Sequence, residues 1–230
     1  MKIKLLSTLL ALSALTAACG DDDSTGPDEG DARVRVVHAS PDAPSVDVLV
    51  DGAVALSDVP YLAASEYLEV PSGDRNLRVN AAGTATTVID ADADLAEGQD
   101  YTVIAGGLAE TIEPIVLADD NRAPASGNVR VRAIHGAPSA PAVDIYVTSP
   151  GVDLTTETPA LANVEFGQVA DYLEVPAGTY QVRVTPAGSK TVVIDSGALT
   201  LASGQVRTAI AVDAAGGGAP FDLLLLEDVN

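Results

Sequence analysis

Several residue types are scarce or missing in this chain of 230 residues, and each absence narrows what the protein can do. There is no tryptophan, and aromatic residues make up only 3% of the sequence. Aromatic ring faces supply much of the contact area in sugar and ligand grooves, so this composition disfavours such a groove. Cys19 is the only cysteine, which excludes an intrachain disulfide and a metal shell built from several thiolates.

Positive charge is also scarce. The chain has 12 lysine and arginine residues against 33 acidic residues, which gives a formal net charge of −21. A field of this sign repels phosphate backbones, so we expect no nucleic-acid partner. Catalytic motifs are missing too: the sequence has no Gly-x-Ser-x-Gly elbow, no His-Glu-x-x-His and no phosphate loop. We therefore expect that the protein is not an enzyme.

The N-terminus has the features of an export signal. Met1–Lys4 carries two lysines, and Leu5–Ala18 is an unbroken run of apolar or small residues that is too short to span a bilayer. The four residues before Cys19, L-T-A-A, resemble a bacterial lipobox, in which the cysteine is lipidated and becomes the mature N-terminus. We therefore predict a signal peptide over residues 1–18 and lipidation at Cys19. The alternative is a plain secretory signal with an incidental cysteine.

The next segment, residues 19–31, is rich in Asp, Gly and Pro and has no apolar side chain large enough to bury. Such a segment stays disordered, and its like charges extend it, so we interpret it as an acidic tether. A calcium site in Asp21–Asp23 is the alternative, although this run supplies too few oxygens for a calcium shell. Because Gly20 rather than Asp follows the cysteine, the predicted location is the cell envelope, at the outer membrane or cell surface.

One stretch of sequence occurs twice. Arg35–Val50 (R-V-V-H-A-S-P-D-A-P-S-V-D-V-L-V) returns as Arg132–Val147 (R-A-I-H-G-A-P-S-A-P-A-V-D-I-Y-V), and Tyr67–Gly73 returns as Tyr172–Gly178. The repeat is about as long as a whole domain, so it indicates a tandem pair of domains and not a solenoid. We place the first repeat at residues 32–120, a linker at 121–127 and the second repeat at 128–230.

The second repeat is longer than the first. His38 and His135 lie 97 residues apart, whereas Tyr67 and Tyr172 lie 105 residues apart, so eight residues are added between these landmarks. The added residues fall in or around Thr148–Glu165. Because surface loops on rigid scaffolds tolerate insertions and often carry function, any difference in binding between the repeats is expected there.

Alternating apolar residues predict β-strands throughout both repeats. Val34, Val36 and His38 share one face of a strand, with Arg33 and Arg35 on the other. Seven or so short strands per repeat, separated by turns, predict an all-β fold of two tandem immunoglobulin-like β-sandwich domains, with a partly open barrel as the alternative. Further strands are expected at Val46–Val50, Glu66–Val70, Arg75–Asn80, Thr86–Asp90, Tyr101–Ala105 and Ile112–Leu117, and at Val131–His135, Val143–Val147, Asp171–Val175, Tyr180–Thr185, Lys190–Asp195, Val206–Val212 and Phe221–Leu226.

These motifs resemble a bacterial family, domain of unknown function 4397. The resemblance rests on R-V-x-H-x-x-P-x-A-P-x-V-D-V, on Y-L-x-V-P-x-G and on a later G-Q-x-Y-T-V-I-A, and it covers most of both repeats. The second repeat departs from the last motif with G-Q-V-R-T-A-I-A at Gly204–Ala211, where arginine replaces tyrosine. The resemblance implies exported, often tandem, β-rich units on cell surfaces and lipoproteins, and it offers no catalytic residues.

The paired histidines, His38 and His135, are the sharpest candidate site residues. Each could serve as a metal ligand or, with Asp47 or Asp144 nearby, as a general base. Each also continues the apolar face of its strand and meets a turn, and no second histidine or cysteine in the same repeat is available to complete a transition-metal shell. We therefore interpret both histidines as structural, with the ring hydrogen-bonded to loop backbone.

The two aspartates of the repeated motif are weaker candidates. Asp47 and Asp144 alternate with apolar residues, so we expect them to face outward or into a turn. We also expect them to pair with Arg35 and Arg132 as features that set the register of the strands, because exposed pairs of this kind contribute little energy.

A third acidic set could bind calcium. Asp90, Asp92 and Asp94 alternate as in some calcium loops, but Leu95 and Tyr101 stand where an EF-hand needs glycine and glutamate. We expect a solvated strand end here, with a loose calcium site as the alternative, and no other cofactor.

The sequence thus predicts a non-catalytic surface lipoprotein of the bacterial cell envelope. It would act as a structural or interaction module, held to the membrane by its N-terminal lipid, with an envelope protein or a glycan as partner. The alternative is an extracellular protein that binds a polysaccharide or a calcium-bridged ligand through loops of its second domain.

Overall fold

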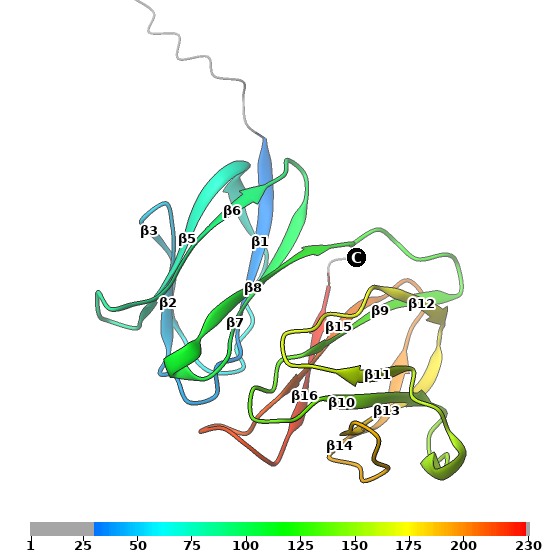
Figure 1. Cartoon of the computed structure of the whole chain (residues 1–230). Coiled ribbons are helices and arrows are strands. Elements are labelled where there is room, and N and C mark those ends of the chain that lie inside the picture. The colour runs from blue at the N-terminus through cyan, green and yellow to red at the C-terminus, as the bar shows by residue number, and fades with distance from the viewer. Residues whose placement is uncertain (1–29, 229–230) are drawn as a thin grey trace, which may run out of the picture.

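The computed structural model describes residues 30–228, which form an all-β protein of two sandwich-like halves (Figure 1). The signal peptide, Cys19 and nearly all of the tether predicted above lie outside the described residues. Two short 3-10 helices, η1 (Ala109–Thr111) and η2 (Leu154–Thr156), lie between strands. No helix within residues 30–228 is long and apolar enough to cross a membrane.

Each half contains eight strands in two four-stranded sheets. The first half comprises β1 (Asp31–His38), β2 (Val46–Val50), β3 (Ala53–Val59), β4 (Leu68–Pro71), β5 (Gly73–Ala81), β6 (Thr87–Leu95), β7 (Asp100–Gly106) and β8 (Glu113–Asp119). The second half comprises β9 (Asn128–His135), β10 (Val143–Thr148), β11 (Leu161–Val164), β12 (Leu173–Pro176), β13 (Gly178–Pro186), β14 (Ile194–Leu201), β15 (Val206–Val212) and β16 (Asp222–Glu227).

The two halves have the same strand order. Sheets β4-β1-β7-β8 and β3-β2-β5-β6 make the first half, and sheets β12-β9-β15-β16 and β11-β10-β13-β14 make the second. Strands β1 and β7 pair in parallel, as do β9 and β15, while the other paired strands are antiparallel. The more specific expectation, an immunoglobulin-like topology, stays a prediction.

Alternation along each strand sends valines and leucines into the space between the two sheets of a half. In the first half the core contains Val34 and Val36 of β1 together with Leu77, Val79 and residues of five other strands. In the second half the corresponding core is smaller and is centred on Val143, Ile145 and Val184. Each half therefore has a core of its own, as the repeat predicts.

A third apolar cluster joins the halves. It combines Val37, Ile104 and Leu117 from sheet β4-β1-β7-β8 with Ile134 and Ile210 of sheet β12-β9-β15-β16, and Val37, Ile104 and Ile210 are fully buried. These two sheets are thus covered on both faces: the inner face packs within its own half, and the outer face packs against the other half. We call this contact between outer faces the joint.

The structure also corrects the expected strand pattern at three places. Strands β3 and β11 were not predicted, because β3 is mostly exposed and β11 is only four residues long. The strand expected at Lys190–Asp195 instead begins at Ile194 and runs to Leu201, as β14. The other expected strands lie close to observed ones.

Candidate functional site

Both histidines hold the turn that follows their strand. The Nε2 atom of His38 lies 3.1 Å from the carbonyl oxygen of Pro44, and that of His135 lies 3.1 Å from the carbonyl oxygen of Pro141. The Nδ1 atom of His135 accepts a hydrogen bond from the backbone N–H of Ala137. Neutral rings that donate from Nε2 satisfy these contacts. Both side chains are fully buried.

Burial also affects the charge of one of these rings. It lowers the pKa of His38 below its ordinary value of 6.5, and the hydrogen bond to Pro44 offsets this only in part. His38 is therefore held neutral, consistent with its place beside Tyr61, whose ring meets it edge-on.

The aspartates of the repeated motif bind backbone N–H groups, and the expectation that they pair with Arg35 and Arg132 is wrong. Asp47 accepts hydrogen bonds from the N–H of Asp58 at 2.8 Å and of Gly83 at 2.9 Å. Asp144 accepts equivalent bonds from Asn163 and Gly188 at 2.9 and 2.8 Å. In each half one carboxylate thus ties a strand end to a turn of the neighbouring hairpin.

The acidic set on β6 lies in a strand and not in a loop. Asp90, Asp92 and Asp94 occupy alternate exposed positions, and the side chain of Asn76 donates to both Asp90 and Asp92. Arg78 pairs with Asp90 at 3.1 Å. Within residues 30–228, no group of three or more His, Cys, Asp or Glu side chains is arranged to hold a metal ion.

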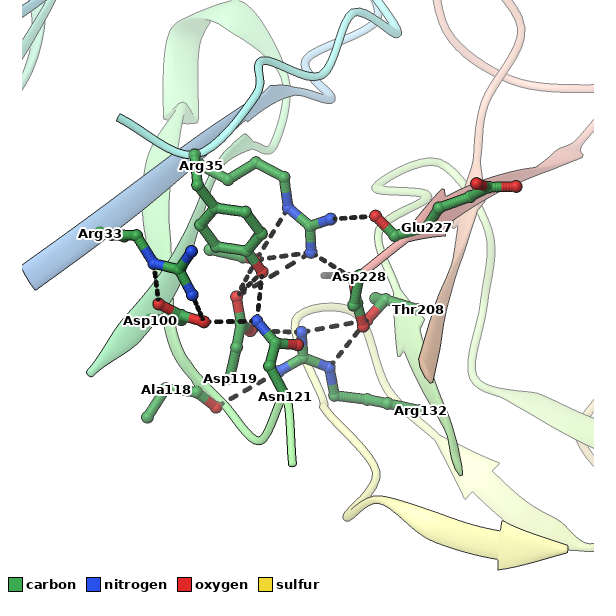
Figure 2. A network of polar contacts seen from close by, with 12 residues as sticks. Arg33, Arg35, Asp100, Ala118, Asp119, Asn121, Arg132, Thr208, Glu227 and Asp228 are labelled. Carbon is green, nitrogen blue, oxygen red and sulfur yellow. Dashed lines mark hydrogen bonds and ion pairs between the residues drawn. The ribbon is translucent and has the colours of Figure 1, made fainter. Parts of the chain in front are cut away.

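The most developed polar arrangement of the molecule lies at the joint, and the sequence analysis did not predict it (Figure 2). Arg35, on the outer face of β1, reaches across to the second half: its Nη2 donates to Oδ1 of Asp228 at 2.6 Å, and its Nη1 donates to the carbonyl oxygen of Glu227. Within its own half the same guanidinium donates to the hydroxyl of Thr102 through Nε, at 3.2 Å.

The second half repeats this arrangement in the opposite direction. Arg132, the counterpart of Arg35, donates from Nη2 to Oδ1 of Asp119 at 2.6 Å and from Nη1 to the carbonyl oxygen of Ala118. Its Nε donates to the hydroxyl of Thr208 at 3.2 Å. Each repeat therefore supplies an arginine to the other and receives one in return, so the joint has an approximate two-fold symmetry.

Each carboxylate of this network is also bonded within its own half. Oδ2 of Asp119 accepts from the hydroxyls of Thr102 and Tyr67, both at 2.6 Å. In the other half, Oδ2 of Asp228 accepts from Thr208 at 2.8 Å and from Tyr172 at 3.4 Å.

The tyrosines of the repeated Tyr-Leu-Glu-Val-Pro motif complete the network. The guanidinium of Arg35 lies 4.8 Å from the ring centre of Tyr67, and that of Arg132 lies 4.6 Å from the ring centre of Tyr172, a distance suited to a cation–π contact. Burial raises the pKa of Tyr172 to about 12 and raises that of Tyr67 as well. Both phenols therefore stay protonated and remain hydrogen-bond donors at any physiological pH.

The network is balanced in charge and almost inaccessible to water. Arg35, Arg132, Asp119 and Asp228 are 3–6% exposed, and two positive groups face two negative ones. Buried ion pairs contribute little net stability compared with apolar replacements, but removing one partner leaves an uncompensated charge and costs several kcal/mol. The arrangement therefore favours this docking of the two halves, because another docking would leave these buried charges without partners of opposite sign.

The linker between the halves is fixed to one end of this network. Asn121 donates from Nδ2 to Asp100 at 2.7 Å, and Asp100 receives a two-pronged contact from Arg33. Hydrogen bonds and ion pairs to Arg122 and Arg130 lower the pKa of Asp120 to about 2. A shallow polar depression of 540 Å³ lies here, but its charged side chains neutralise one another.

Sequence reasoning missed the joint because arginine on a strand normally indicates a solvated face. The signal that could have shown it was the residue two positions further on the same face: Val37 follows Arg35, and Ile104 follows Thr102. A strand in which both faces carry apolar residues is buried on both faces.

Comparisons with known proteins agree with the repeat. The model of a family described as "Domain of unknown function (DUF4397)" matches residues 32–146 and 147–230. The boundary between these segments falls within β10, whereas the chain crosses from one half to the other between β8 and β9. No curated protein matches the chain.

Comparison with solved structures found only weak similarities. The Bacillus anthracis TIE protein is 11% identical, with 79% of this chain and 33% of that chain covered and a TM-score of 0.25. A leucine-rich repeat protein from Bacteroides thetaiotaomicron is 14% identical, with 83% and 27% covered and a TM-score of 0.21. The chain thus spans a third or less of the length of these two proteins. A structure of streptococcal family 41 carbohydrate-binding modules, described for alpha-glucan recognition, is 13% identical, with 84% and 96% covered and a TM-score of 0.27.

Proposed function

The chain belongs to the family described as "Domain of unknown function (DUF4397)", whose model matches residues 32–146 and 147–230, and we propose that it is a non-catalytic interaction module of the bacterial envelope. In this proposal the two repeats act as one rigid unit, exported by the signal over residues 1–18 and anchored through lipid on Cys19.

One observation carries this proposal: the polar residues that recur in both repeats are engaged in holding the fold together. The histidines hold turns, Asp47 and Asp144 tie hairpins, and Arg35 and Arg132 lock the halves to each other. A hydrolase would instead need such groups to face a substrate in a cleft. A rigid body with fixed loops suits a protein that presents a surface to a partner.

The anchoring half of the proposal is tested on protein recovered from cells. Mass spectrometry of the mature N-terminus should find Cys19 as the first residue with acyl mass on it, and the protein should fractionate with membranes. Cys19→Ser should lose the acyl mass and move to the soluble fraction. An unmodified Cys19 in membrane-free material from the parent would contradict the anchor.

The interaction half is tested with two parallel captures. The full mature chain, immobilised through its N-terminus, is incubated with envelope extract and separately applied to a glycan array. Saturable capture of a defined envelope protein supports the proposal, and saturable binding to one glycan class would replace the protein partner with the polysaccharide alternative. Turnover of a generic ester, peptide or glycoside that a single substitution abolishes would overturn the non-catalytic assignment.

A further inference from the structure

The two sandwiches differ at one pair of neighbouring positions on their inner faces. In the first half, Val36 of β1 lies beside Val103 of β7 in the parallel register. In the second half the same two positions hold Ala133 of β9 and Ala209 of β15, again side by side. Two valines that fill the middle of the first core are thus both alanine in the second.

This difference leaves space. Val36 and Val103 are 3% and 6% exposed, and the free volume between the sheets of the first half is only 30 Å³. Ala133 and Ala209 are partly exposed and line a cleft of 130 Å³ between the sheets of the second half. Surrounding structure relaxes only partly when core side chains are shortened, so the missing methyl groups appear as volume.

The cleft is apolar and open at its rim. Its walls include Val131, Ile145, Val182 and Leu199, and its rim carries Leu173, which is 56% exposed. Leu68, at the matching place in the first half, is partly buried. Exposed apolar side chains around an apolar hollow are a feature that binding sites share and that ordinary surfaces lack. Part of the longer connection of the second repeat, Ala160 and Leu161, also borders the cleft.

Charge at the rim restricts the ligand. Where the first half has Tyr101, the second has Arg207, and this guanidinium is paired with Glu227 at 2.5 Å. Asp171 and Arg132 also line the cleft, and Arg132 is paired with Asp119. With Arg207 and Arg132 both neutralised by their partners and Asp171 as a further acid, an anionic head group such as that of a fatty acid is repelled. The cleft therefore suits an uncharged molecule.

From these observations we infer that the second sandwich binds one small, uncharged, apolar molecule between its sheets, with the bulk of a single benzene ring or a short alkyl group. An apolar cavity of about 150 Å³ stays dry and binds benzene, so 130 Å³ is enough for such a guest. Drug-sized ligands need about 300–1,000 Å³, which excludes larger guests without rearrangement. The inference goes beyond the proposed function and does not depend on it.

The test uses the full mature chain and toluene as the probe. Toluene is titrated while amide signals are followed by NMR, and the signals of β9, β13 and β15 should shift saturably with a stoichiometry of one. Ala133→Val/Ala209→Val restores the residues of the first half and should weaken toluene binding at least ten-fold. If the double variant does not fold, the single variant Ala209→Val, which adds less bulk, is used instead. It should weaken toluene binding by a smaller factor.

A reciprocal variant serves as the matched control. Val36→Ala/Val103→Ala should open the first core in the same way and raise the stoichiometry from one to two. The proposal is overturned if the parent shows no saturable shift up to the solubility of toluene, if the shifted signals lie away from the cleft, or if filling the cleft leaves the affinity unchanged.

Discussion

The guanidinium of Arg35 and the carboxylate of Asp228, which are 193 residues apart in the sequence, meet at 2.6 Å in the centre of the molecule. Arg132 and Asp119 form the matching pair at the same distance. The arginine of each repeated motif thus finds its acid at the end of the last strand in the other repeat. A duplicated domain has in this way become a single body, because the charges of either half are satisfied only when both are present.

Removing one of these charges should be costly. Arg35→Met leaves Asp228 buried without its cation, so we expect a loss of about 3–5 kcal/mol in the free energy of unfolding, measured by urea denaturation. Arg122→Met removes an arginine whose side chain is 84% exposed and should cost no more than about 1 kcal/mol, because exposed ion pairs contribute little.

A double-mutant cycle separates the pair from general damage. Asp228→Asn keeps an acceptor for Thr208 and removes the charge, so the combined variant Arg35→Met/Asp228→Asn should be less destabilised than the sum of its single changes, by about 0.5–3 kcal/mol. Strict additivity of the two changes would show that Arg35 and Asp228 do not interact energetically.

The joint should also hold without the covalent linker. Produced separately, residues 30–120 and 128–230 would each expose an apolar outer face and an unpaired arginine. We expect the two fragments to associate one-to-one on mixing, as seen by analytical ultracentrifugation, because the joint is assembled from both. Ile210→Ala removes a fully buried contact at its centre and should weaken the association. If the two fragments were each stable and remained monomeric after mixing, the single-body interpretation would be refuted.

The sequence predicted the inner, core-facing side of the strands correctly but not the outer side that packs against the other half. Val34 and Val36 alternate against Arg33 and Arg35, which correctly predicted a strand and an inner core. The expectation that Arg35 forms an exposed pair with Asp47 was wrong, because a hydrophobic pattern reports which side chains avoid water and not which sheets stack. Only the structure brings Asp228 to that face.

For the candidate site residues, local contacts could be predicted from the sequence, but contacts that depend on strand order could not. That His38 meets a turn could be inferred from its place at the end of a strand, before a proline-containing loop. The partners of Asp47 could not be, since Asp58 and Gly83 belong to two different hairpins and come together only through strand order. Strand β11 was missed because it is only four residues long, and its counterpart β3, in the same place in the first half, was missed because it is mostly exposed.

The hydrogen bonds that Asp47 and Asp144 accept from backbone N–H groups give a prediction that compares the two repeats. Asp144 is 6% exposed, so Asp144→Ala should leave the N–H groups of Asn163 and Gly188 without a partner and cost about 1–3 kcal/mol in the free energy of unfolding. Asp47→Ala should cost less, because water reaches the more exposed Asp47 and can replace the lost acceptor. Calorimetric melting of the two variants beside the parent measures the difference, and an equal or reversed order would contradict it.

The last prediction concerns His38 and pH. Burial lowers the pKa of His38 in the folded protein, so below about pH 6.5 the unfolded chain takes up a proton that the folded chain does not. Stability from the neutral ring is complete above pH 6.5 and declines as the pH falls below it, by up to about 1.4 kcal/mol per pH unit. Carboxylates with a lowered pKa act in another pH range: the contribution of Asp120, whose pKa is about 2, is lost only as the pH falls from 3.8 toward 2.

Urea midpoints measured at pH 7.5, 6.5 and 5.5 should therefore fall in the parent and fall less in His38→Gln, whose amide can still donate to Pro44. If both proteins lost stability equally over this range, proton uptake at His38 would not be coupled to unfolding.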